Sequence, residues 1–395
     1  MGAVANPGSQ ECARHGVCYL SRMDANRIVV VGAGILGASI AYHLAKRGAR
    51  VVIVDAVRPG AGATEKSFGW INATFSKCPR AYFDLNLLAL NSWRRLEYEL
   101  GGELKVQWGG SVAWAAGDAT ADGLRAEDLR NSVRRHQEWG YPTHLVDEDE
   151  FRRLLPNVAP GNFGAACHSE FEGALDPLDA LKALLRQVRE LGGEVRYPFE
   201  AAEFKLEAGR VSAVRGGESS IDAGTVVLAA GVATGRLAAM AQVSVPLKES
   251  RGVLVHTRPQ PKLIDRVVLA PGVHCKQKLD GRVVVGGQIV AGAGTAAGTA
   301  QETTDDGQQI LREAAHVLPG IRGVAVERVT VGHRVMPVDE YPVIGFSERC
   351  PNLYVAAMHS GVTLAPLIGQ YAALEILDGA RVTSLEPYRP SRFDD

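Results

Sequence analysis

Residues 27 to 55 read RIVVVGAGILGASIAYHLAKRGARVVIVD, and this stretch decides the fold of its part of the chain. The apolar run from Ile28 to Val31 predicts a buried strand. A helix is predicted from Ile35 to about Lys46, and a second buried strand from Val51 to Val54 ends at an acid. Strand, glycine turn, helix, strand and acid in this order are typical of a Rossmann unit that binds an ADP moiety.

Each residue of the motif has a physical role in that interpretation. Gly32 allows the tight turn out of the strand, Gly34 lets the backbone approach a pyrophosphate, and Gly37 lets the helix pack closely on the strand. The helix begins with Ile35 and Leu36, and its N-terminus is expected to face the phosphates. Asp55 is placed to accept hydrogen bonds from a ribose hydroxyl.

Composition limits the function classes. With 395 residues the chain is long enough for two domains, and 43 basic against 44 acidic residues give no signature of nucleic-acid or membrane binding. The six cysteines lack metal-site spacing; Cys12 and Cys18 flank His15 without a fourth ligand nearby. We therefore expect no metal, reduced thiols and a cytoplasmic protein. Residues 1–24, which lack an apolar signal segment, are expected to form a loose tail.

The rest of the chain predicts an interleaved α/β and α+β organisation. A Rossmann-type domain is expected to consist of residues 25–103, 168–245 and 332–395. A second domain, built on an antiparallel sheet, is expected from residues 104–167 and 246–331, where strand-like runs surround a Gly/Ala/Thr loop at 291–300 and a helix at 307–317.

Two further segments have the composition of ligand-binding backbone. The loop at 58–72 is rich in glycine and hydroxyl groups, and its candidate contacts are Ala63, Thr64, Ser67 and Gly69. Residues 225–234 predict a short buried strand that ends on small residues, where Ala230 and Gly231 let a backbone come close to a ligand.

Four motifs together resemble the D-amino-acid oxidase family of flavoproteins, and within it glycine and sarcosine oxidases. Besides the opening motif they are Ala229-Ala230-Gly231, GHRVMPVDEYPVIG at 332–345 and HSGVTLAP at 359–366; the C-terminal LEPYRPSRF at 385–393 also resembles that family. The resemblance spans residues 27 to 393 and implies a glutathione-reductase-like FAD domain interleaved with the substrate domain.

The resemblance implies FAD as cofactor and oxidation of a C–N bond in an amine or amino acid, with a hydride passing to flavin N5. The imine then hydrolyses, and O2 is the expected acceptor. The turn at Gly361, with Val362 and Thr363, opens a helix whose N-terminus is expected to face the flavin's pyrimidine edge. Sarcosine oxidases attach FAD to a cysteine where this chain has Gly332, so non-covalent FAD is expected. Val284 occupies the position of their lysine near flavin N5.

The same resemblance implies the substrate residues. Arg334 stands where glycine oxidases hold the substrate carboxylate, and a guanidinium fork suits that group. His274 replaces an assisting tyrosine, and His359 replaces a second active-site arginine.

Several alternatives stay open at the level of sequence: a dehydrogenase using another acceptor, a biosynthetic oxidase that removes glyoxylate from an N-carboxymethyl amino acid, and a non-catalytic flavin-binding subunit. The substrate's identity and self-association of the chain into a homo-oligomer are also left open.

Overall fold

The computed structural model describes residues 27–117, 125–287 and 300–394. The expected N-terminal tail, with Cys12 and Cys18, and nearly all of the Gly/Ala/Thr loop lie outside the described residues.

A six-stranded sheet forms the first layer of the fold. It is parallel throughout, except that its edge strand β20 runs antiparallel to β21. Because side chains alternate along a strand, Ile28 and Val30 enter the core on one face while Val29 and Val31 enter the core on the other. The strands, in sheet order, are β20 (Val343–Phe346), β21 (Leu353–Ala357), β12 (Thr225–Leu228), β1 (Arg27–Val31), β2 (Arg50–Val54) and β8 (Glu194–Arg196).

Both faces of this sheet are covered. One face packs against the helices α2 (Ile35–Lys46), α3 (Arg80–Glu99), α6 (Pro177–Glu190) and α9 (Gly361–Asp378). The other packs against helix α7 (Thr234–Ala239) and a small antiparallel sheet of β9 (Glu203–Glu207), β10 (Arg210–Gly216) and β11 (Ser219–Asp222).

An eight-stranded sheet forms the second body. Its strands are antiparallel, apart from the parallel pair β15 and β4. Helices α5 (Glu148–Leu154) and α8 (Ala300–Val317) contribute to the core on one face, and α4 (Ala126–Glu138) packs on the other. The strands, in sheet order, are β18 (Val326–His333), β14 (Arg251–Thr257), β17 (Val283–Gly287), β16 (Val273–Gln277), β15 (Val267–Leu269), β4 (Ser111–Ala116), β6 (Phe163–Ser169) and β5 (Thr143–Val146).

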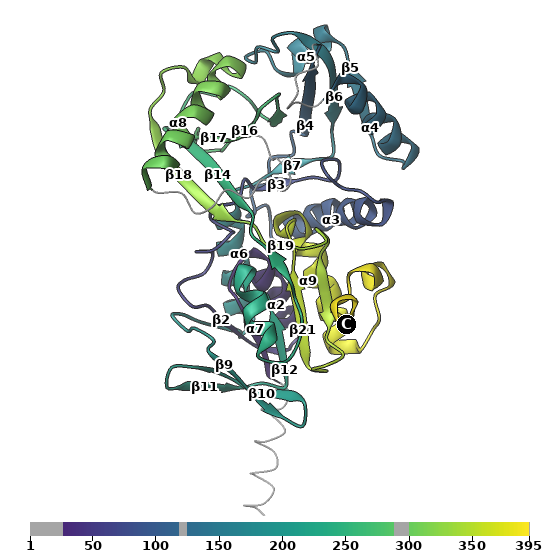
Figure 1. Ribbon diagram of the computed structural model, residues 1–395, viewed down its shortest axis with the longest axis vertical. Helices are drawn as coiled ribbons and strands as arrows, with labels where there is room; N and C mark the ends of the chain where they lie inside the picture. The colour runs from purple at the N-terminus through teal and green to yellow at the C-terminus, as the bar shows by residue number, and fades with distance from the viewer. Residues whose placement is uncertain (1–26, 118–124, 288–299, 395) are drawn as a thin grey trace, which may run out of the picture.

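The two sheets lie toward opposite ends of the long axis, and short elements lie between them (Figure 1). Strand β3 (Trp70–Ile71) pairs with β7 (Gly173–Ala174), and β13 (Leu247–Lys248) pairs with β19 (Met336–Pro337). The elements of the described residues are completed by four 3-10 turns: η1 (Gly231–Ala233), η2 (Pro319–Ile321), η3 (Thr383–Tyr388) and η4 (Pro390–Phe393).

Helices α2 and α9 pack closely because their contact is made of small groups. Ser39 Oγ donates to the carbonyl of Ala365 at 2.7 Å. A side chain at Gly369 would lie 2.4 Å from the His43 ring, so only glycine fits there. The N-termini of the two helices are thereby held in a fixed relation.

The predicted class, a Rossmann-type domain interleaved with a domain built on a largely antiparallel sheet, is confirmed. The residue limits given for the two domains stay a prediction. The strand expected over 225–234 is shorter: β12 ends at Leu228, and the left-handed backbone of Gly231 (φ 61°) starts η1 instead. None of the helices in the described part of the chain is long and apolar enough to span a membrane.

Candidate cofactor and substrate site

A cavity of about 820 Å³ is lined by the first strand–helix turn, by the N-terminus of α9 and by strands of the eight-stranded sheet. It brings together nearly all of the sequence-predicted residues. Those that line it are Gly32, Gly34, Ile35, Leu36, Asp55, Ala63, Thr64, Ser67, Gly69, Ala230, Gly231, His274, Arg334, His359, Gly361, Val362 and Thr363. Gly37 does not line it, and the binding role of each residue stays a prediction.

The glycines of the opening motif are required by close backbone contacts. A Cβ at Gly32, where φ is +107°, would lie 2.3 Å from the carbonyl oxygen of Ala229. A Cβ at Gly37 would lie 2.0 Å from the carbonyl oxygen of Gly32. The turn, the helix and the end of β12 therefore meet at a distance that no side chain would allow.

Polar groups fix the shape of this turn. Asp55 accepts a hydrogen bond from the Ala33 N–H at 2.9 Å through Oδ2 and from the Val57 N–H at 3.1 Å through Oδ1. Thr64 Oγ1 accepts from the Ile35 N–H at 3.1 Å. Asp55 thus holds the protein backbone as well as facing the cavity.

The N-terminus of α2 is suited to an anion. Its N-cap residue is Gly34, which has no side chain to cap the helix, and its first turn contains no acidic residue. The N–H groups of Leu36 and Gly37 have no protein acceptor within the described ranges. Unsatisfied N–H groups and the positive end of the helix dipole together favour a phosphate here.

The opposite end of the cavity contains the N-terminus of α9. Trp93 Nε1 donates to the carbonyls of Val362 and Thr363, both at 3.0 Å. Thr363 Oγ1 donates to the Trp70 carbonyl at 3.2 Å, so the start of α9 is tied to the loop that precedes α3.

That loop is held by a buried carboxylate. Glu172 is fully buried and accepts hydrogen bonds from the N–H groups of Ala73 at 3.0 Å and Thr74 at 3.1 Å. It also accepts from Ser111 Oγ at 2.6 Å and from Trp70 Nε1 at 3.1 Å. Five donors, counting the Thr74 hydroxyl, compensate for the burial of this side chain.

Arg334 follows the end of β18 and is half-buried. A Cβ at Gly252 would lie 2.9 Å from its Nη2, so a glycine on β14 makes room for the guanidinium. Its Nη1 lies 3.4 Å from Ser250 Oγ, and no carboxylate of the described chain lies within 4.0 Å of it. Burial lowers the pKa of Arg334 from its ordinary value, but the group remains a cation without an anionic partner.

His274 lies on β16 opposite Gly286, and a Cβ there would lie 2.3 Å from the imidazole. The Phe68 ring meets it edge-on, with centroids 4.6 Å apart. Burial and then the nearby Arg334 lower the pKa of His274 to about 4, so the ring is neutral above about pH 5.

His359 precedes α9 and lines the cavity, toward which its side chain is exposed. Desolvation, followed by the charges of Lys77 and Arg334, lowers the pKa of His359 to about 3. Two cations therefore act on one imidazole, which stays neutral at physiological pH.

Sequence reasoning missed three polar side chains of this end: Asn72, Lys77 and Tyr82. Asn72 is buried, and its Oδ1 has no hydrogen-bond partner in the part of the chain that the structure describes. Lys77 is only 5% exposed and contacts Ser360, 283 residues further along the chain. Nothing in local spacing could reveal these residues, because tertiary structure alone brings them to the cavity.

Lys276 is also buried, and burial lowers its pKa to about 7. It lies opposite Val284 in the β16–β17 register and donates to the Leu175 carbonyl at 2.6 Å. Neither Lys276 nor Val284 lines the main cavity.

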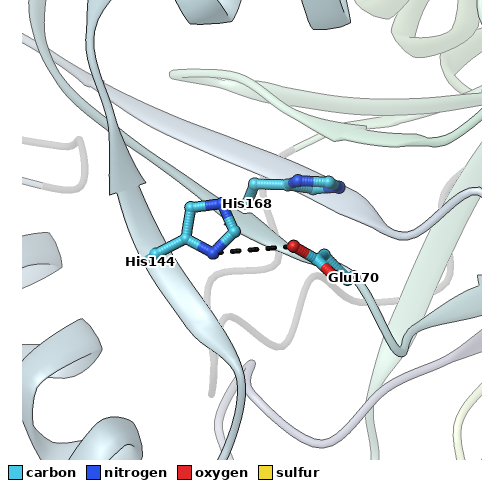
Figure 2. Close-up of side chains that lie close together, drawn as sticks. All are labelled: His144, His168 and Glu170. Atoms are coloured by element: carbon cyan, nitrogen blue, oxygen red, sulfur yellow. Dashed lines mark ion pairs between the residues drawn. The ribbon is translucent and has the colours of Figure 1, made fainter.

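A separate cluster of two imidazoles and a carboxylate lies on the eight-stranded sheet, formed by His144 on β5, His168 on β6 and Glu170 (Figure 2). His144 Nδ1 lies 3.8 Å from Glu170 Oε1. The guanidinium of Arg266 lies 3.5 Å from His168 Nε2, so a cation already faces one imidazole of the group. None of these residues lines the main cavity.

Comparison with known proteins identifies the family. Glycine oxidase of Bacillus licheniformis is 26% identical over 373 residues, which cover 92% of this chain and 96% of that protein. One of the subunits of the opine oxidase of Rhizobium meliloti is 25% identical over 376 residues, 93% of this chain and 97% of that protein. The crystal structure of glycine oxidase from Geobacillus kaustophilus superposes with a TM-score of 0.82 at 24% identity, covering 93% of this chain and 99% of that one.

The family model described as FAD dependent oxidoreductase matches residues 27–374. The resemblance inferred from the sequence, the FAD cofactor and the oxidoreductase class are thereby confirmed. The chain belongs to the DAO family of FAD-dependent oxidoreductases.

Proposed function

We propose that this protein oxidises the C–N bond of an amine that carries a carboxylate, an amino acid or an N-substituted glycine, and that Arg334 binds the carboxylate. The observation that carries the proposal is the Arg334 guanidinium, which lines the cavity without a carboxylate partner among the described residues. A half-buried cation of this kind is stabilised by an anionic ligand. The similarity to glycine oxidase and opine oxidase supports the same interpretation.

The residues of the cavity fit FAD at both ends. The free N–H groups at the start of α2 suit the pyrophosphate, and Asp55 suits the adenosine ribose. Asn72 Oδ1, buried and unpartnered, suits a hydrogen-bond donor at the other end. When bound, FAD would accept the hydride, with its two electrons, that leaves the carbon beside the amine. Since Gly332 stands at the attachment position implied by the family resemblance, we propose that FAD is held non-covalently.

The chain's own residues orient the substrate. Arg334 would fix the carboxylate and thereby the direction of the amine-bearing carbon. His274 and His359, neutral above about pH 5, can accept a hydrogen bond from the substrate's amine without adding positive charge beside it. Helix α9 directs its N-terminal dipole into the same part of the cavity, where it would stabilise negative charge.

The electron acceptor is proposed to be O2. The alternative is a dehydrogenase that passes electrons to another acceptor, and the similarity to a protein named as one subunit of an oxidase gives that alternative weight. If hydrogen peroxide forms in air in proportion to the amine consumed, the protein is an oxidase. If the amine bleaches the flavin and the flavin then stays reduced in air, the result supports the dehydrogenase.

Arg334→Met and Arg334→Lys test the carboxylate anchor. Losing a charge-assisted bidentate pair of about 1.5–3 kcal/mol should raise KM for the carboxylate substrate about 10- to 100-fold in the methionine variant. The lysine variant should lie between it and the wild type. Steady-state rates of amine consumption over a range of substrate concentrations give KM, and flavin content serves as the control for folding. An unchanged KM in Arg334→Met would show that the carboxylate binds elsewhere.

A non-catalytic flavin-binding subunit is the competing class of function. The isolated protein distinguishes the two, because only an enzyme reduces its own flavin when an amine is added without oxygen. Glycine, sarcosine, iminodiacetate, D-amino acids and N-carboxymethyl amino acids form the panel.

A further inference from the structure

We propose that the cavity contains a second anion site, formed by Lys77, Ser360 and Tyr82, and that the amine it accepts therefore carries a second acidic group besides the carboxylate at Arg334. The inference rests on the proposed function for the identity of the substrate, and on the residues themselves for the anion site.

Lys77 is a buried ammonium without an anion. It is 5% exposed, its Nζ donates to Ser360 Oγ, and it lies 5.0 Å from the centroid of the Tyr82 ring. Within the described ranges no carboxylate lies within 4.0 Å of its Nζ. The hydrogen bond to Ser360 is its one hydrogen bond within the described ranges, so two of the three ammonium N–H groups have no hydrogen-bond acceptor there. An uncompensated buried charge is costly, and a bound carboxylate would compensate it.

Donors outnumber acceptors around Ser360. Its Oγ accepts from both Lys77 Nζ and Tyr82 Oη, the latter at 2.9 Å. Ser360 is 8% exposed and occupies the N-cap of α9, yet its side chain caps no helix N–H. With two donors already on its oxygen, the hydroxyl proton remains to be donated. The ammonium, this hydroxyl and the dipole of an 18-residue helix all favour negative charge at one place.

The second site is close to the first. Lys77, Arg334 and His359 line the same cavity, and the charges of both cations lower the pKa of the His359 imidazole. A single small molecule with an acid at each end could therefore contact both.

The acidic residues that line the cavity do not neutralise Lys77 and Arg334. Of the described lining residues, three are acidic. Asp55 is engaged by the N–H groups of the first turn, Glu340 pairs with Lys248 at 2.6 Å, and Glu200 lies 4.0 Å from Arg236. The excess positive charge at Lys77 and Arg334 is matched by a dianion, such as an imino diacid or an N-carboxymethyl amino acid, in which the amine lies between two carboxylates.

Non-oxidisable analogues test the site independently of turnover. Diglycolate carries two carboxylates on an ether, and methoxyacetate carries one. Binding to the FAD-loaded protein is measured from the change in the flavin spectrum. Diglycolate should bind the wild type at least about tenfold more tightly than methoxyacetate. Methionine is a neutral side chain of similar length. In Lys77→Met the affinity for diglycolate should fall about 10- to 100-fold, while the affinity for methoxyacetate should fall less than about threefold. Lys77→Arg, which keeps the charge, should recover most of the affinity for diglycolate.

Flavin reduction gives the second readout. The second group is an acid in iminodiacetate and a neutral hydroxyl in N-(2-hydroxyethyl)glycine. Lys77→Met should slow flavin reduction by iminodiacetate but not by N-(2-hydroxyethyl)glycine. An equal loss for both compounds, or for both ether analogues, would place Lys77 at the flavin and overturn the inference. If no amine of the panel reduces the flavin, the proposed function fails, while selective diglycolate binding through Lys77 would still establish the anion site.

Discussion

The two ends of the cavity are formed by different kinds of chemical group. The end at α2 is made of backbone, and most of its residues come from one continuous stretch, 32 to 64. The end at α9 is made of charged and polar side chains from widely separated segments; Lys77 and Ser360 are 283 residues apart. The first end depends on glycines without side chains, with Asp55 and Thr64 holding the turn by hydrogen bonds, and the second depends on charged and polar side chains.

This difference predicts which function each end controls. Changes at the α2 end should alter retention of the cofactor without altering the choice of substrate. Changes at the α9 end should alter the choice of substrate without altering retention of the cofactor. Three predictions test this separation at decreasing size of effect.

The largest effect is expected from Gly32→Ala. The new Cβ would meet the Ala229 carbonyl at 2.3 Å, and φ of +107° is strained for alanine, so the turn must shift. We expect FAD affinity to fall by at least about 100-fold, measured as flavin per protein after gel filtration.

Gly48→Ala is the matched control. Gly48 also has a positive φ (+80°), but nothing lies within 4 Å of its Cβ position. The change should cost about 1–2 kcal/mol of stability and leave the flavin content unchanged. Equal flavin loss in both variants would mean that backbone strain, rather than the close contact at Gly32, governs binding.

A smaller effect is expected from Asp55→Ala. The variant loses the hydrogen bonds to Ala33 and Val57 and the proposed ribose contact, so FAD affinity should fall about 10- to 100-fold. At saturating FAD, the ratio of reduction rates for one-acid and two-acid amines should equal that of the wild type. A changed ratio would break the separation between the two ends. Asp55→Asn keeps one acceptor oxygen, so its FAD affinity should fall less than that of Asp55→Ala.

The smallest effect concerns pH at the α9 end. Because the pKa of His274 is lowered to about 4 and that of His359 to about 3, neither ring gains a proton between pH 8 and pH 5. Methoxyacetate is an anion throughout this range, so its dissociation constant should change by less than about twofold. In Arg334→Met, where one neighbouring cation is removed, the pKa of both rings should rise. Tighter wild-type binding as pH falls through about 6.5 would show instead that an imidazole becomes charged.

The sequence predicted the α2 end well because its determinants are local. The strand, helix and glycine spacing between Arg27 and Asp55 encode a βαβ unit through short-range sterics and a regular apolar pattern, and the structure reproduces helix Ile35–Lys46 with the same limits. Arg334 and His359 were located only because the surrounding motifs resemble a known family.

Lys77 and Asn72 were not predicted, for a physical reason. A lone lysine and a lone asparagine in a loop carry no periodicity, and in most proteins both are solvated. Their burial follows from Glu172, which lies just before β7 and holds the loop from about a hundred residues away, and from the docking of α9. Long-range packing of this kind has no signature in a single sequence.

The close packing of α2 against α9 has a consequence for ligand length. Both helices direct an N-terminus into the cavity, and the contact through Ser39, Ala365 and Gly369 fixes the separation of these two termini. The helix pair thus holds two anion-attracting N-termini at one fixed distance from each other. The part of FAD between its pyrophosphate and its isoalloxazine ring would span the two termini, so the helix packing sets the length that this part of the ligand must have.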